Sequence, residues 1–160
     1  MASRLFVVNE WLLDDLLGHR GTDKRRESFS WLEAMHARCD RIAVLESSPW
    51  AQKAYKLMKH PDTTIRGVSR FLHLKVLQNQ LKSQLVSPGE LLQAPDDVRK
   101  VTPESDRYLV DLYFTVKAAQ LITTDTVLHG NLTASQKVKV EMRDSFIRAY
   151  LAGTDTGHGT

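Results

Sequence analysis

The sequence predicts an α/β fold, a three-layer α/β/α sandwich built around a short, mainly parallel central sheet. Two observations lead to this class. The continuous apolar run Leu5–Val8 is typical of a strand covered on both faces, and Leu121–Thr124 is a β-branched stretch typical of a strand. Segments in which apolar residues recur at helical spacing separate these stretches. Helices that alternate with short strands favour a parallel sheet with helices on both sides.

The first half of the chain alternates between the two patterns. It predicts, in order, a strand at 5–8, a helix at 12–17, a polar basic loop at 19–26, a helix at 29–39, a strand at 41–45, and helices at 50–58 and 65–81. Gly18 suits the end of the first helix. Ser48 followed by Pro49 is a strong signal for the start of the third helix, because serine caps helices and proline fits their first position.

The second half is less regular. Residues 85–101 contain prolines and a glycine and are hard to assign, although a short strand fits within them. Thr102-Pro103 repeats the cap-and-proline signal before a helix over 109–119. The clearest β-branched strand is 121–124, and apolar spacing predicts a last helix over 138–150.

The 160 residues fit one domain over 1–152, because a chain of this length can bury a core of its own. The tail at 153–160 lacks apolar residues, so we expect it to be disordered. The apolar runs are too short to span a membrane, and the start of the chain does not resemble a signal peptide. A single cysteine, Cys39, fits a reducing, cytoplasmic compartment, and we expect it to be a small core residue.

The formal charge of +3 and the pI of about 9.1 permit nucleic-acid binding without requiring it. Several basic side chains are candidates for contacts with phosphates, and the alternative for each group is an ordinary solvated face. These candidates are Lys24-Arg25-Arg26, Lys53, Lys56, Lys59, Arg66 and Arg70.

Polar side chains follow the predicted strands where ligands bind in open parallel sheets, just beyond the carboxyl ends. Asn9 and Glu10 follow the first strand, Glu46 follows the second, and Asp125 follows the strand at 121–124. Asp106 lies in the first turn of the helix that leads into that last strand. Oxygen ligands of this kind suit Mg²⁺ or Mn²⁺, so we predict a divalent-metal site at this edge.

Each acid also has a structural interpretation. Asp106 would be a favourable partner for the helix dipole, and Asp125 would cap the turn after its strand. Glu46 would be a solvated strand-end residue. Asp14 and Asp15 lie opposite the leucine face of the first helix, so we expect both to be solvated.

The segment from Asp106 to Asp125 resembles the late part of PIN-domain ribonucleases, in which an aspartate opens a helix and the next strand ends in Thr-x-Asp. The early strand with its leucine-rich helix, and the second strand leading into Ser48-Pro49, are also similar to that family. Active PIN domains are Mg²⁺- or Mn²⁺-dependent ribonucleases, and many are toxins paired with antitoxins. The resemblance implies RNA as substrate and an antitoxin-like protein partner, and a homodimer would also be compatible with it.

Only some of the acidic positions of the PIN family are also acidic in this sequence. Asp106 and Asp125 match the two late aspartates. The first aspartate is replaced by Asn9, whose amide oxygen can ligate a metal but carries no charge. The second acid, expected on the helix after Ser48-Pro49, is absent, because Gln52 and Lys53 occupy those positions.

Glu46 precedes that helix, and Glu10 would point away from Asn9 in an extended chain. Three alternatives stay open at this stage. One is a metal-dependent endoribonuclease acting on single-stranded RNA, with Asp106, Asp125 and Asn9 as catalytic residues and Glu10 and Glu46 as further metal ligands. Another is a catalytically impaired PIN-like module that binds RNA or a protein partner. The last is an unrelated α/β domain whose edge acids are structural.

Overall fold

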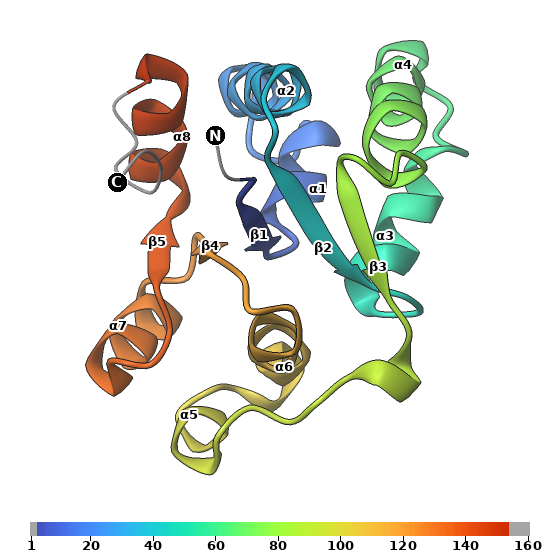
Figure 1. Ribbon diagram of the computed structural model, residues 1–160. Coiled ribbons are helices and arrows are strands. Elements are labelled where there is room, and N and C mark those ends of the chain that lie inside the picture. The colour runs from blue at the N-terminus through green and yellow to red at the C-terminus, as the bar shows by residue number, and fades with distance from the viewer. Residues whose placement is uncertain (1–2, 154–160) are drawn as a thin grey trace.

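The computed structural model describes residues 3–153, and the fold within them is a five-stranded, all-parallel sheet with helices on both faces (Figure 1). The strands are β1 (Leu5–Val8), β2 (Arg41–Leu45), β3 (Ser83–Val86), β4 (Gln120–Thr123) and β5 (Val140–Met142). Their spatial order is β3-β2-β1-β4-β5, so β1 is the central strand and pairs with β2 on one side and β4 on the other. The predicted three-layer α/β/α class is confirmed.

Two apolar clusters lie on opposite faces of this sheet because successive side chains of each strand point to opposite sides. Phe6 and Val8 of β1 belong to one cluster, and Leu5 and Val7 belong to the other. All four side chains are buried, as a run of four apolar residues predicts for a central parallel strand.

The helices divide between the two faces (Figure 1). One face is covered by α1 (Trp11–Leu16), α2 (Thr22–Ala37), α3 (Pro49–Leu57), α4 (Thr63–Phe71) with its π-helical continuation η1 (Leu72–Leu77), and α8 (Arg143–Ala152). The other face is covered by α5 (Asp96–Lys100), α6 (Arg107–Val116) and α7 (Thr126–Ser135), and two short 3₁₀ turns are η2 (Pro88–Glu90) and η3 (Glu104–Asp106). No helix within residues 3–153 is long and apolar enough to cross a membrane.

The helix start at Ser48-Pro49 forms as predicted. The Ser48 hydroxyl accepts a hydrogen bond of 3.1 Å from the Ala51 N–H, and Pro49 is the first residue of α3. Thr102 behaves differently from the prediction, because its hydroxyl donates to the Val98 carbonyl, at 2.7 Å, and closes α5 instead of opening α6. Helix α6 begins after η3, with Asp106 at its N-cap.

Two predicted segments have the wrong secondary structure. The loop expected at residues 19–26 is instead largely helical, since α2 begins at Thr22. Lys24 on its first turn pairs with Asp144 of α8, and no local pattern reveals that contact. The helix expected over 138–150 is a short edge strand, β5, followed by α8. The helix expected over 65–81 ends at Leu77, before β3.

Two further expectations concern single positions. Cys39 is exposed and not part of the core, because it lies in the turn between α2 and β2. The tail expected to be disordered, 153–160, falls outside the described residues except for Gly153, which has a positive φ of 72° and ends α8.

The prediction that Asp15 is solvated is wrong, because the Asp15 side chain is fully buried in an ion pair with Arg143 of α8. The Arg143 Nε lies 2.9 Å from the Asp15 Oδ2, and the Ser28 hydroxyl donates to the same oxygen at 2.7 Å. Arg143 is itself 1% exposed and also donates to Glu27, at 2.7 Å. One buried cation therefore joins α1, α2 and α8.

Breaking this pair should destabilise the fold strongly. Asp15→Asn removes the fully buried counter-charge of the Arg143 guanidinium, whose other carboxylate partners, Glu27 and Asp144, have exposed side chains, and the loss of a buried partner typically costs about 3–5 kcal/mol of unfolding free energy. Urea unfolding followed by circular dichroism measures the change. Asp23→Asn, an exposed aspartate on α2, is the matched control and should change stability by less than about 0.5 kcal/mol. Equal, small effects of the two substitutions would show that the buried pair does not hold the helices together.

Candidate functional site

The candidate site lies where the strand order reverses, between the carboxyl ends of β1 and β4. The Asn9 N–H donates to the Ile122 carbonyl of β4 at 3.1 Å, and the Trp11 indole N–H donates to the same oxygen at 2.9 Å. These bonds hold the segment after β1 beside the end of β4. Crevices at such switch points are where open α/β sheets bind ligands.

Asp125 caps α7, as its structural interpretation predicts. Its Oδ1 accepts hydrogen bonds from the N–H groups of Val127, at 2.9 Å, and Leu128, at 3.1 Å. Its own N–H donates to the Thr123 hydroxyl at 3.0 Å, which fixes the turn after β4. The cap uses one carboxylate oxygen, so the exposed side chain still presents Oδ2 and its charge at this edge.

Asp106 is half-buried at the N-cap of α6, but its side chain makes no capping hydrogen bond. Burial raises the pKa of the Asp106 carboxyl, and the neighbouring carboxylates of Asp125 and Glu10 raise it further. Such coupling requires Asp125 and Glu10 each to lie within electrostatic range of Asp106. Acids from three separate segments of the chain therefore lie around the carboxyl ends of β1 and β4.

Glu10 belongs to this group, contrary to the expectation that it points away. Its backbone is helical, with φ −67° and ψ −7°, because it is the N-cap residue of α1 and not part of an extended strand. The Asn9 amide oxygen accepts the Glu10 N–H at 2.7 Å. This short bond holds Asn9 and Glu10 in a tight turn at the end of β1.

Lys53 occupies the position where the PIN resemblance predicts an acid. Its ammonium lies 2.7 Å from the Asp14 Oδ1 and 3.7 Å from the Glu10 Oε1. Asp14 is therefore paired and half-buried, and not freely solvated as expected. Neither Asp106 nor Asp125 makes an ion pair with any residue in 3–153.

Glu46 lies apart from these acids. Its side chain is exposed, and its N–H donates to the Val86 carbonyl at the end of β3, at 2.8 Å. It is not among the charges that raise the pKa of Asp106. Glu46 is therefore a solvated strand-end residue, as its structural interpretation holds, and the edge group consists of Asn9, Glu10, Asp106 and Asp125.

Tyr108 is a residue of this edge that the sequence analysis did not single out. Its hydroxyl is buried and makes no well-aligned hydrogen bond within the described chain, although the nearby Trp50 N–H favours its ionised form. Burial and the charges of Glu10 and Asp106 together raise the pKa of Tyr108, so the phenol stays protonated. A protonated phenol among carboxylates is a hydrogen-bond donor for an anionic ligand. Tyr108 lies two residues after Asp106, and this position in the sequence could have identified it as a candidate site residue.

The oxygen atoms at the carboxyl edge determine which metal ions the candidate site could bind. Within residues 3–153, no three His, Cys, Asp or Glu side chains are close enough to hold a metal ion by themselves. The oxygen donors at the edge are two unpaired carboxylates, Asp106 and Asp125, and the amide of Asn9. All are hard ligands of the kind that Mg²⁺ and Mn²⁺ prefer. Lys53 lies between Asp14 and Glu10 and offsets part of their charge.

The raised pKa of Asp106 predicts how stability depends on pH. The folded state binds this proton more tightly than the unfolded chain does, so the ionised Asp106 lowers stability at neutral pH. That loss disappears as pH falls through the raised folded-state pKa. Asp106→Asn should therefore raise the free energy of unfolding at neutral pH, and the gain should shrink in acid. Urea unfolding at both pH values tests this, with the exposed Glu104→Gln as control. A loss of stability at neutral pH would contradict it.

Comparisons of the chain with protein-family models, with curated proteins and with solved structures gave no match. The function is therefore argued from the chain's own residues, and above all from the acids gathered at the switch point of the sheet.

Proposed function

We propose that this protein is a PIN-type, divalent-metal-dependent endoribonuclease that acts on single-stranded RNA and uses one cation. The observation that supports it best is the convergence of Asp106, Asp125 and Glu10 at the switch point of a parallel sheet. Within residues 3–153, Glu10 is the one of the three that lies within ion-pairing distance of a basic side chain. Carboxylates gathered without counter-charges raise one another's energy, and a bound cation would relieve that repulsion.

The residues of the chain have distinct roles in this proposal. Asp106, Asp125 and the Asn9 amide oxygen would hold Mg²⁺ or Mn²⁺, which when bound polarises a phosphate and lowers the pKa of a bound water. The Tyr108 hydroxyl donates to a phosphate oxygen, because the carboxylates around it keep it protonated. The Asp125 cap and the Asn9 turn fix their oxygens before substrate arrives, which reduces the reorganisation needed.

A second candidate is a PIN-like module that binds RNA or a protein partner without cleaving it. Lys53 favours this candidate, since its ammonium stands where the PIN resemblance predicts an acid and reduces the charge available to metals. A neutral Asn9 in place of the first aspartate acts in the same direction. The antitoxin-like partner, the homodimer and the cytoplasmic location stay predictions under either candidate.

A cleavage assay with charge-matched variants separates the two candidates. Purified protein is incubated with a pool of single-stranded RNA and Mn²⁺ or Mg²⁺, with a chelator control. We expect slow, metal-dependent cleavage by the wild type. Asn9→Asp should raise the rate about tenfold, because hard cations bind more tightly as ligand charge increases. Asp125→Asn should lower it roughly 100-fold or more.

Asp125→Asn is a sharp test because asparagine is as good an N-cap as aspartate, so α7 keeps its cap while the site loses one charge. Glu46→Gln, which removes an exposed acid outside the edge group, should leave the rate unchanged. An inert wild type whose Asn9→Asp variant is also inert would favour the binding module. Fast cleavage by both wild type and Asp125→Asn would place the chemistry elsewhere.

A further inference from the structure

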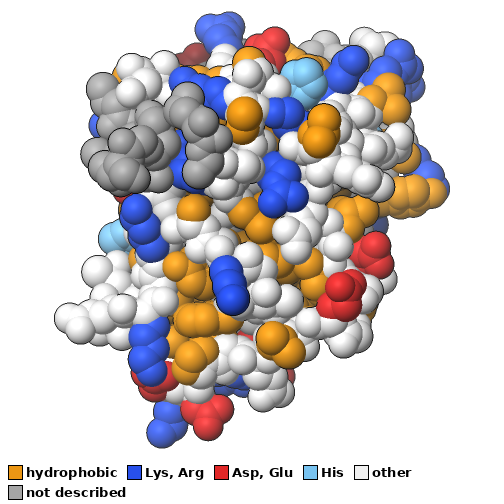
Figure 2. Space-filling view, viewed as in Figure 1, with side chains coloured by type: hydrophobic (Ala, Val, Ile, Leu, Met, Phe, Trp, Pro, Cys, Tyr) orange, Lys and Arg blue, Asp and Glu red, His pale blue; other side chains and the backbone are white. Residues whose placement is uncertain are grey.

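A second, basic cavity lies away from the acidic edge, between the end of α3 and the helix α4–η1. Its volume is about 280 Å³. Arg66, Ser69, Arg70, His73 and Gln78 provide polar side chains, and Met58 closes the α3 side. Among residues 3–153, none that lines it is acidic. Figure 2 shows Lys and Arg side chains gathered at the upper right, where Figure 1 places α4.

The two arginines form a pair suited to an anion. Arg66 and Arg70 are four residues apart on α4, so their side chains lie on the same face of the helix. Both are exposed, and neither makes an ion pair with a residue in 3–153. Arginine favours phosphate because its planar fork of N–H groups matches two phosphate oxygens.

Ser69, between the arginines in sequence, gives independent support. It is 1% exposed, and its hydroxyl has no hydrogen-bond partner within the described chain. A serine inside a helix usually satisfies its hydroxyl by bonding to a carbonyl one turn earlier or to water. An unpartnered hydroxyl in the lining of a basic cavity is a donor that a ligand oxygen would satisfy.

The backbone of this wall is also unusual. Helix α4 passes directly into η1, a π helix, and a wide turn of that kind occurs frequently at functional sites. His73 lies in η1, and its Nε2 is 2.8 Å from the Ala54 carbonyl of α3, which ties the two walls of the cavity together. Gln78, the C-cap of η1, adds an amide to the lining.

Helix α3 connects the two sites. Its N-cap, Ser48, lies just after β2 at the carboxyl edge, and its C-cap, Met58, lines the basic cavity. Ten residues separate them, about 15 Å along the axis at 1.5 Å per residue. Ala51, Tyr55 and Met58 lie on one stripe of α3, at spacings of four and three residues. A shallow groove of about 320 Å³ follows this stripe and is lined by Ser47, Ala51, Gln52, Tyr55 and Lys56.

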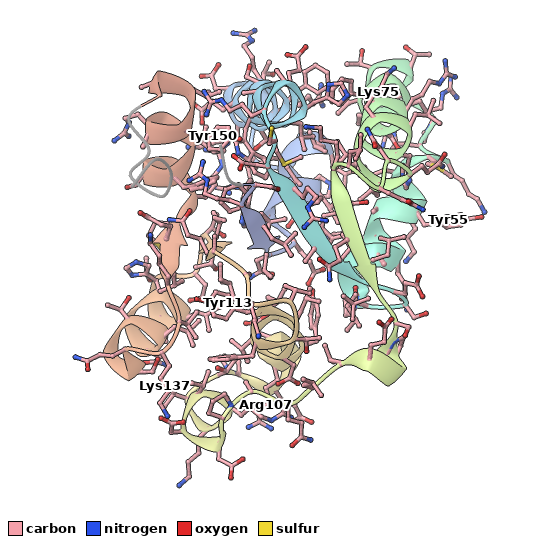
Figure 3. All side chains as sticks on the ribbon, in the orientation of Figure 1. Tyr55, Lys75, Arg107, Tyr113, Lys137 and Tyr150 are labelled. Atoms are coloured by element: carbon pink, nitrogen blue, oxygen red, sulfur yellow. The ribbon has the colours of Figure 1, made fainter. Side chains whose placement is uncertain are left out.

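Tyr55 offers a flat apolar surface along this path. It is 53% exposed, and Figure 3 shows it on the side of α3 that faces away from the sheet. The Lys59 ammonium lies 4.8 Å from the centre of its ring. Exposed aromatic rings beside basic side chains are the means by which proteins bind single strands, since every base can stack on a ring.

From these observations we infer that the Arg66–Arg70 cavity binds a backbone phosphate of single-stranded RNA, and that the strand runs along α3, over Tyr55, toward the acidic edge. This inference rests on the proposed function and adds a substrate-binding subsite to it. The acidic edge repels phosphates in the absence of a cation, so affinity for RNA comes from this basic path. A substrate of several nucleotides contacts the basic path. A dinucleotide bound at the acidic edge is too short to reach the basic path.

The test is the binding of a fluorescently labelled single-stranded RNA oligonucleotide by anisotropy, with a chelator present to prevent cleavage. Arg66→Gln combined with Arg70→Gln should weaken binding about tenfold or more. The slope of log affinity against log salt should fall by about 0.7, since the cavity holds one phosphate and each phosphate contact on a single strand contributes about 0.7. Tyr55→Ala should weaken binding roughly 5- to 150-fold, as expected for the loss of one stacked base.

Lys139→Gln combined with Arg148→Gln is the matched control, because it removes the same charge from two exposed basic side chains outside the basic path. This control should retain wild-type affinity and slope, and circular dichroism should show all variants folded. Equal weakening by both double variants would overturn the inference, because binding would then follow net charge alone. Binding of inorganic phosphate that depends on the two arginines, without RNA binding, would also overturn it in favour of a small phosphorylated ligand.

Cleavage of a dinucleotide separates this inference from the proposed function. The Arg66/Arg70 double variant should cleave a dinucleotide at the wild-type rate and a longer RNA more slowly. If the wild type cleaves nothing but the double variant still loses RNA affinity, the proposed catalysis fails and the phosphate subsite stands. If the wild type cleaves RNA and the double variant binds and cleaves it equally well, the subsite fails and the catalysis stands.

Discussion

The position of β1 between β2 and β4 is the constraint on which the rest of the structure depends. A strand paired on both sides and covered on both faces must be apolar throughout, and all four residues of β1 are buried. The chain leaves β1 toward β2 and β3, then returns to the other side of β1 to form β4, which opens the switch point. Glu10, Asp106 and Asp125 are each the N-cap residue of a helix near it. The positive ends of those helices offset part of the repulsion among the three carboxylates.

The position of each element in the sheet explains which elements were predictable from the sequence. The interior strands β1 and β2 appear in the sequence as continuous apolar runs because both of their faces are buried, and β4 is marked by the β-branched pair Ile122 and Thr123. The edge strand β5 has only three residues, all half-buried, with Glu141 at its centre, so no run marks it. Helix α7 was not predicted either, because only Leu128 and Leu132 are buried in it and the pattern is weak.

The candidate site was predictable in part, for a physical reason. Polar residues after parallel strands meet at one edge, so the proximity of Asp106 and Asp125 follows from topology together with spacing. The place of Glu10 depends on one helical turn directly after β1, which the apolar pattern does not report. The ion pair of Asp15 with Arg143 joins residues 128 positions apart, so a single sequence cannot reveal it. The same holds for the contact of Lys53 with Asp14.

Charge at the acidic edge links metal binding to the basic path. Glu10, Asp14, Asp106 and Asp125 supply four carboxylates, and the basic side chains within ion-pairing distance of them in residues 3–153 are Lys53 and, at 3.7 Å from Asp14, His19. A phosphodiester would therefore meet an excess of negative charge unless a cation is bound. In the proposed function, affinity for RNA would then come from elsewhere on the molecule, and Arg66, Arg70 and Tyr55 lie on α4 and α3. Under this proposal the two tasks are separate, so that the edge would keep the charge that holds a cation while the basic path would hold the strand.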